Sequence, residues 1–75
     1  MFQNTLFAEV GGTVAKIVAP VGSHVNAFDE VLVLESMKME FSVGAPSSGT
    51  VLEVLVTEGD VIAEGQALAV MECPE

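Results

Sequence analysis

The chain has very few basic residues and a single cysteine. Its 75 residues include 2 Lys plus Arg against 11 Asp plus Glu, which gives a net charge of −9. Nucleic acid is a poor partner for such a surface, because phosphate binding requires clustered lysine and arginine. The acidic surface instead favours encounters with basic protein surfaces. Cys73 has no second cysteine with which to form an internal disulfide, so we expect a reducing, cytoplasmic setting.

Long apolar runs and helix signals are missing too. The sequence is 51% hydrophobic, which suffices for a core, yet no run approaches the ~20 residues of a membrane-spanning helix. The first residues, MFQNTLFAEV, lack the basic region and long apolar stretch of a secretory signal. No capped stripe of period 3.6 indicates a helix. We therefore expect one small all-β domain over residues 1–75 with no membrane association.

The most informative pattern is an internal repeat. Residues 11–35 align without a gap on residues 48–72, apolar positions match apolar positions, and the turn glycines Gly22 and Gly59 coincide. Each copy contains short segments rich in β-branched residues, and the segments VGSHV and EGDVI read as turns between them. Neither copy could bury its apolar face alone. The sequence therefore predicts two interlocking halves of a β-sandwich or flattened barrel, related by a pseudo-two-fold axis.

The segment ESMKME, residues 35–40, lies between the two copies. If the flanking segments pair as a hairpin, Met37 and Lys38 form its two-residue tip. Tight hairpins normally use Asn-Gly or Asp-Gly there, because both residues need positive φ. A local rule broken in an otherwise consistent sequence suggests a functional site. Exposed methionines also suit a surface that a partner covers, because their side chains are flexible and polarizable.

This segment, together with PSSGTV after it and EGDVIAEGQAL near the end, resembles the biotinyl domains of biotin-dependent carboxylases, the biotin carboxyl carrier proteins. The resemblance covers nearly the whole chain. It implies a flattened eight-stranded barrel-sandwich hybrid with the lysine at a hairpin tip. It also implies biotin attached covalently to Lys38, methionines Met37 and Met39 beside it, and an acidic residue, Glu35, that a biotin protein ligase senses. Ser36 stands where many members of the family have alanine.

The resemblance implies a non-catalytic carrier. The biotinylated lysine side chain would move between a biotin carboxylase and a carboxyltransferase. The carrier alone is expected to be a monomer, either free-standing or excised from a longer chain. We do not expect the inserted thumb loop of some bacterial carriers, because the halves align without a gap between Gly22 and Val31. The sequence leaves the acceptor open, with acetyl-CoA, propionyl-CoA, pyruvate and urea among the candidates. It contains no paired acid and base or nucleophile constellation that would indicate an enzyme.

Two other functions remain open. One is a lipoyl carrier of a 2-oxo acid dehydrogenase or of glycine cleavage, although lipoyl domains usually carry Asp-Lys-Ala at the tip. The other is an unmodified structural module. The remaining residues have simpler interpretations. We expect a solvent-facing strand position for Lys16, a turn position without a metal for His24, and a bystander thiol near a frayed end for Cys73. We expect core positions for Phe7, Phe28, Phe41 and Met71, with a brace for the turn below the tip as the alternative for Phe28, and a solvated position or a mirror-related hairpin end for Glu72.

Overall fold

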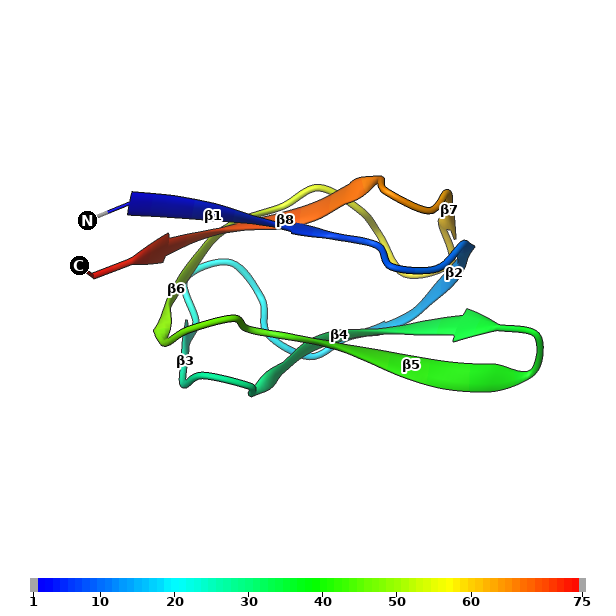
Figure 1. Cartoon of the computed structure of the whole chain (residues 1–75), viewed down its shortest axis with the longest axis horizontal. Helices are drawn as coiled ribbons and strands as arrows, with labels where there is room; N and C mark the ends of the chain where they lie inside the picture. Colours follow the sequence, from blue (N-terminus) through cyan, green and yellow to red (C-terminus); the bar gives the residue numbers. More distant parts are fainter. Residues whose placement is uncertain (1, 75) are drawn as a thin grey trace.

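Eight antiparallel strands account for most of the chain in the computed structural model, which describes residues 2–74. They form two four-stranded sheets with the orders β1-β8-β6-β3 and β5-β4-β2-β7 (Figure 1). The strands are β1 (Phe2–Phe7), β2 (Gly12–Ile17), β3 (His24–Val25), β4 (Glu30–Ser36), β5 (Met39–Gly44), β6 (Gly49–Val54), β7 (Val61–Ile62) and β8 (Ala67–Cys73). The predicted all-β, eight-stranded architecture is confirmed. Residues 2–74 contain no helix that could cross a membrane.

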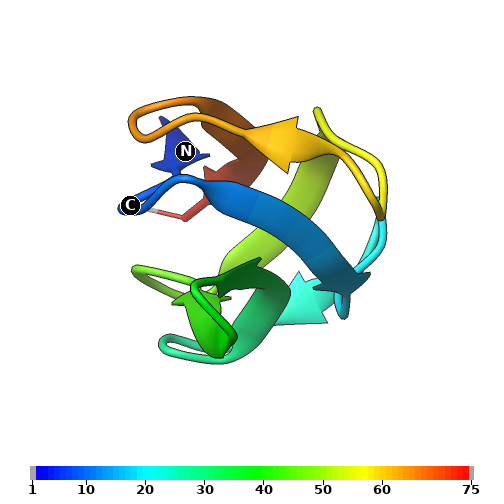
Figure 2. The ribbon, with the colours of Figure 1, turned by 90° about the vertical axis from the view of Figure 1, so that its right-hand side faces the viewer.

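Strand pairing reproduces the sequence repeat residue by residue. Val14 of β2 lies opposite Leu34 of β4, and the equivalent Val51 of β6 lies opposite Met71 of β8. A β-bulge follows the first residue of each pair at the same place in both halves. The halves also interlock, because β3 pairs with β6 and β7 pairs with β2 (Figure 2). The predicted pseudo-two-fold arrangement is therefore confirmed.

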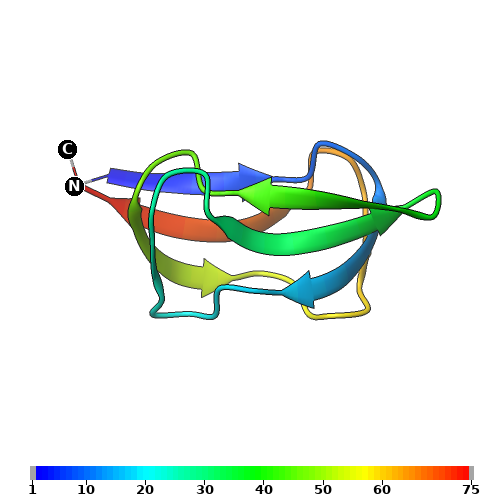
Figure 3. The same ribbon diagram turned by 90° about the horizontal axis from the view of Figure 1, so that it is seen from below.

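The symmetry extends beyond the segments in which the repeat is visible. Asn4 of β1 lies opposite Met71, just as Phe41 of β5 lies opposite Leu34. Strand β1 is thus the equivalent of β5, although FQNTLF and MEFSVG share almost no residues. The start of β1 and the end of β8 lie at one end of the molecule, and the β4–β5 tip projects from the other (Figure 3).

The core lies between the two sheets and is built from aliphatic residues of both copies. Two clusters of buried residues meet at Val43 and Val54, which pack against both. Met71 is 0% exposed, so its predicted core position is confirmed. Burying a side chain of this size stabilises a fold by about 1.5–3 kcal/mol. The largest fully buried side chains are Leu32, Leu34, Leu68, Met71, Val14, Val31, Val51 and Cys73.

The prediction that three phenylalanines fill the core is wrong. Phe7 is 56%, Phe41 37% and Phe28 86% exposed. Phe7 lies at the end of edge strand β1, where the register shifts, and Phe41 lies on edge strand β5, so no neighbouring strand covers them from outside. Phe28 lies in the turn before β4, outside both sheets. The aliphatic residues of the inner strands already fill the space between the sheets.

Two of the predicted turns also contain strand residues. His24 is not a turn residue, because it belongs to β3 and lies opposite Thr50 of β6. The counterpart of β3 in the second copy is the two-residue strand β7. The turn glycines themselves are placed as predicted: Gly22 has φ 92° and Gly59 φ 94°. Their N–H groups donate equivalent hydrogen bonds, at 2.8 Å, to carbonyls of the opposite half.

Candidate functional site

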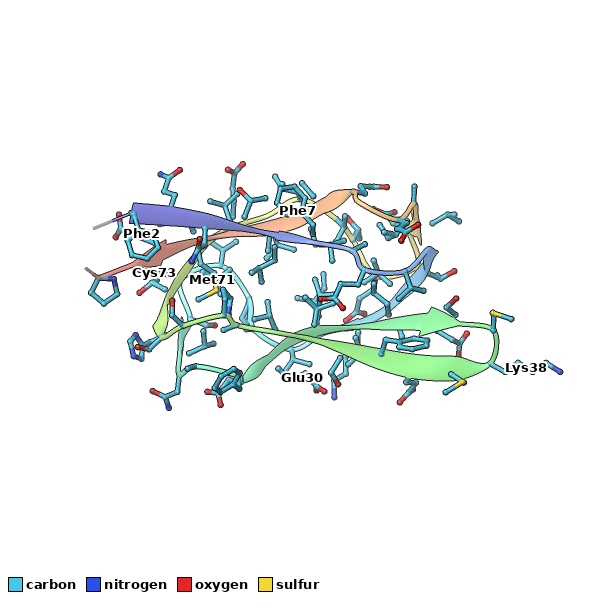
Figure 4. The ribbon with its side chains drawn as sticks, viewed as in Figure 1. Phe2, Phe7, Glu30, Lys38, Met71 and Cys73 are labelled. Carbon is cyan, nitrogen blue, oxygen red and sulfur yellow. The ribbon has the colours of Figure 1, made fainter. Side chains whose placement is uncertain are left out.

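The β4–β5 hairpin ends in a two-residue turn that presents the lysine. Ser36 and Met39 are the last paired residues, so Met37 and Lys38 form the turn as the sequence predicts. Their φ angles are 53° and 65°. Positive φ at both central residues is the backbone requirement of a type I′ turn, whose twist matches that of the flanking strands. The Lys38 side chain extends away from the body of the molecule (Figure 4).

Non-glycine residues adopt this turn conformation at a cost. The left-handed region brings Cβ close to the following carbonyl oxygen, which costs about 1–2 kcal/mol per residue. Elsewhere in residues 2–74, turn positions with positive φ are occupied by glycine, except at Phe28. Strain of this kind is concentrated at functional sites, where the surrounding structure holds the residue in place. The strained backbone at Met37 and Lys38 therefore marks this turn as the candidate functional site.

The tip side chains are open to solvent. Met37 is 92% and Met39 59% exposed. An isolated apolar side chain in water contributes no burial energy to the fold. The two methionines are therefore available to a partner that approaches Lys38, which is itself exposed.

A pair of like charges lies at the base of the tip. Glu35 of β4 is directly opposite Glu40 of β5, and both side chains are exposed. Like charges directly opposite each other destabilise an antiparallel pair. In the other half, Glu72 occupies the position of Glu35 and lies opposite Gln3, which is neutral. The interpretation of Glu72 as the mirror-related end of a hairpin-like strand pair thus agrees with the structure, and the acidic pair belongs to the tip alone.

The hairpin is anchored on a tightly packed base. A Cβ atom at Gly12 of β2 would collide with the carbonyl oxygen of Glu35, and one at Gly49 would collide with that of Glu72. Both glycines therefore permit close contact between strands. This contact lies one residue before Ser36, so the projecting turn starts from a closely packed part of the sheet.

A groove of about 560 Å³ runs between the edge strands β1 and β5. Its apolar lining residues include Leu6, Leu34 and Phe41. Its lining comprises Thr5, Leu6, Phe7, Glu9, Val10, Leu34, Glu40, Phe41, Ser42, Val43, Gly44 and Pro46.

Cys73 is not in a frayed end. It is the last residue of β8 and is 0% exposed. Its sulfur accepts hydrogen bonds from the Asn4 side-chain amide at 3.7 Å and from the Ser47 hydroxyl at 3.3 Å. A thiol enclosed in this way is a small core residue. Lys16, the other lysine, is exposed on β2 as predicted. Within residues 2–74, no three His, Cys, Asp or Glu side chains are placed to hold a metal ion.

The chain is similar to carboxylases and to small attachment proteins. It is 43% identical over 65 residues to pyruvate carboxylase of Bacillus subtilis, covering 87% of this chain and 6% of that enzyme. It is 39% identical to the biotin/lipoyl attachment protein of Bacillus subtilis, covering 85% of this chain and 88% of that protein. The biotinylated protein TB7.3 homolog of Mycobacterium leprae is 41% identical over 85% of this chain and 90% of its own length.

Solved structures show the same relationship. The Kluyveromyces lactis urea carboxylase superimposes with a TM-score of 0.91 at 40% identity, covering 96% of this chain and 6% of that one. The lipoyl domain of the 2-oxoglutarate dehydrogenase complex from Azotobacter vinelandii gives a TM-score of 0.75 at 26% identity, covering 88% and 84%. This chain therefore spans a small fraction of the large carboxylases and most of the length of the isolated domains. The family model for biotin and lipoyl attachment, described as "Biotin-requiring enzyme", matches residues 6–71, and the chain belongs to this family.

Proposed function

We propose that the chain is a biotin carboxyl carrier whose biotin is attached to Lys38. The observation that carries the proposal is the Met-Lys-Met tip, held in a strained turn at the end of a projecting hairpin on a closely packed base. This choice of turn residues does not stabilise the fold, but it makes the lysine amine accessible to a modifying enzyme. The names of relatives that include a biotinylated protein and several carboxylases support the same function.

Attachment requires a separate biotin protein ligase. The ligase first joins the biotin carboxylate to AMP, with release of pyrophosphate from ATP. The neutral lysine amine then attacks the biotinyl carbonyl, an amide bond forms, AMP leaves, and the amine releases a proton. We expect the ligase to accept that proton. Glu35, Met37 and Met39 are the residues through which the ligase would recognise the tip.

The domain itself would supply presentation and delivery, not catalysis. Biotin accepts a carboxyl group at a ureido nitrogen in a biotin carboxylase and passes it to an acceptor in a carboxyltransferase, so the chemistry belongs to the cofactor and these enzymes. A tether on Lys38 raises the effective concentration of biotin at each of the two sites. We assign this carrier role to the single domain of residues 1–75.

A lipoyl carrier is the second candidate, because the lipoyl domain from Azotobacter vinelandii has the same fold. A lipoyl arm would occupy the same lysine and use the same projection from the barrel. The exposed methionines on both sides of Lys38 favour biotin, because the tip lacks the Asp-Lys-Ala sequence of lipoyl domains.

Intact-mass measurement after parallel ligation reactions tests the proposal. Wild type is incubated with ATP, biotin and a biotin protein ligase, or with ATP, lipoate and a lipoate ligase. We expect one biotinyl increment on wild type and on Lys16→Arg, and none on Lys38→Arg, which keeps the charge but cannot form the amide. A lipoyl increment alone would establish the second candidate. The absence of both increments from the folded protein would reject a carrier function.

A further inference from the structure

The groove between β1 and β5 extends toward the end of the molecule that carries Lys38. The last three residues of each strand line it, and these residues are equivalent in the repeat. Glu40 and Phe41, near the start of β5, line it as well. Their counterparts in β1 are Gln3 and Asn4, which do not belong to the lining. The groove is therefore asymmetric, and its additional part lies beside the attachment lysine.

This part of the groove combines an apolar surface with hydrogen-bonding groups. Leu34 and Phe41 supply apolar atoms, and the side chains of Glu9 and Glu40 in the same lining are exposed. Because β1 and β5 are edge strands of the described chain, each presents unpaired backbone N–H and C=O groups along one side. Small-ligand sites have this composition, an apolar lining with a few polar groups that fix orientation. The volume of about 560 Å³ lies within the range of about 300–1,000 Å³ that such sites occupy.

A group attached to Lys38 can reach this part of the groove. About ten single bonds separate the Lys38 Cα atom from the ring system of an attached biotin, and at about 3.3–3.6 Å for every three bonds they span about 11–12 Å. Glu40 and Phe41 follow Lys38 by two and three residues, which places them about 7–10 Å away at about 3.3 Å per residue. The Lys38 side chain is exposed, so it can turn back along β5 from the outward position in Figure 4.

We propose that the groove is a resting site for the biotin ring carried by Lys38 of the same chain, an inference that rests on the proposed function. Biotin matches both kinds of surface. Its ureido N–H groups would donate to the carboxylates of Glu9 and Glu40, and its sulfur-containing ring would pack against Phe41, since sulfur makes favourable contacts with aromatic rings. A lipoyl ring has no N–H donor, so the two carboxylates favour biotin as the occupant.

A tethered ring needs little affinity to occupy the groove. A short flexible tether gives an effective concentration in the millimolar range. A groove that binds the biotin ring with a Kd of about 1 mM is then occupied about half of the time. The same weak affinity lets a partner enzyme withdraw the ring, because the enzyme has only to compete with a millimolar site. The resting site would thus cover the apolar part of biotin between encounters without retaining it.

The rate at which streptavidin captures the biotinylated protein tests the resting site. Streptavidin encloses the ring of biotin, so it binds only a ring that has left the groove, and the rate falls with the free fraction. Phe41→Thr, which removes a partly exposed aromatic residue of the lining, should speed capture about twofold or more. Glu9→Ala should speed it to a smaller extent. Phe2→Thr is the matched control, because Phe2 is 46% exposed on β1 but lies outside the groove, and its capture rate should equal that of wild type.

Nuclear magnetic resonance of the wild-type protein gives a second test that needs no substitution. Biotinylation should shift the backbone amide signals of Leu6, Glu9 and Phe41 as well as those of residues 37–39, and the biotin ring protons should show contacts with the Phe41 ring. Shifts confined to residues 37–39, or a Phe41→Thr capture rate equal to that of wild type, would overturn the resting site. If wild type accepts no biotin, both this proposal and the proposed function fail, whereas normal biotinylation with either of those two results rejects the resting site alone.

Discussion

Replacing Met37-Lys38 with Asn-Gly should stabilise the domain while abolishing attachment. The side chain of Met37 is 92% exposed, so removing it sacrifices almost no burial and isolates the backbone contribution. Relief of left-handed strain at two residues is worth about 2 kcal/mol. The added glycine increases the freedom of the unfolded chain and offsets about 0.5–1 kcal/mol of this gain. The Met37→Asn, Lys38→Gly double variant should therefore be more stable by about 1 kcal/mol.

Thermal unfolding followed by circular dichroism measures this effect. For a domain of this size, a gain of about 1 kcal/mol raises Tm by about 4–8 °C. Met37→Leu is the matched control, because it changes the side chain but keeps the strained backbone, and its Tm should equal that of wild type. A double variant that melts at or below the wild-type temperature would refute the argument that the tip is strained for the sake of function.

Three further predictions concern the scaffold. Gly12→Ala and Gly49→Ala should each lower the free energy of unfolding in urea by about 1–3 kcal/mol, because the added Cβ collides with a carbonyl oxygen. Gly11→Ala is the control and should change little, because its Cβ would lie 3.4 Å from the nearest atom. An unchanged stability of Gly12→Ala would contradict the close contact between the strands. Met71→Ala should cost about 2–5 kcal/mol by loss of a fully buried side chain, and Met37→Ala almost nothing, so similar losses in the same experiment would disprove the assigned core. A thiol reagent should label Cys73 slowly in the native protein and rapidly in urea; rapid labelling without denaturant would show that the thiol is accessible.

The repeat made most of the fold predictable. Paired apolar segments and coincident glycines identify β2, β4, β6 and β8, because buried inner strands carry a strong hydrophobic pattern. The two-residue strands β3 and β7 are too short to show any pattern, so the sequence predicts only turns there. Strand β1 is equivalent to β5 in register but not in sequence, because edge strands tolerate many side chains. Its place in the symmetry could therefore not be deduced from the residues.

The position of the candidate site and the positive φ of its two turn residues were predictable, whereas the exposure of the phenylalanines was not. Pairing of the segments around residues 35–40 placed Met37 and Lys38 at a hairpin tip, and the structure confirms that placement. Burial of the phenylalanines was predicted wrongly, because aromatic residues usually contribute to cores. Alignment of Phe28 with Gly65 was already available in the repeat and could have shown that Phe28 occupies a left-handed turn position. Its exposure and strain became visible only in the folded chain.

The central claim is that Lys38 carries biotin in the living cell, and the most direct test is proteolytic mapping of the protein isolated from its source organism. Mass spectrometry of the peptide that contains Met37, Lys38 and Met39 should show one biotinyl group on Lys38, with Lys16 unmodified. A lipoyl group on Lys38, an unmodified Lys38 throughout the isolated protein, or biotin on Lys16 would contradict the account.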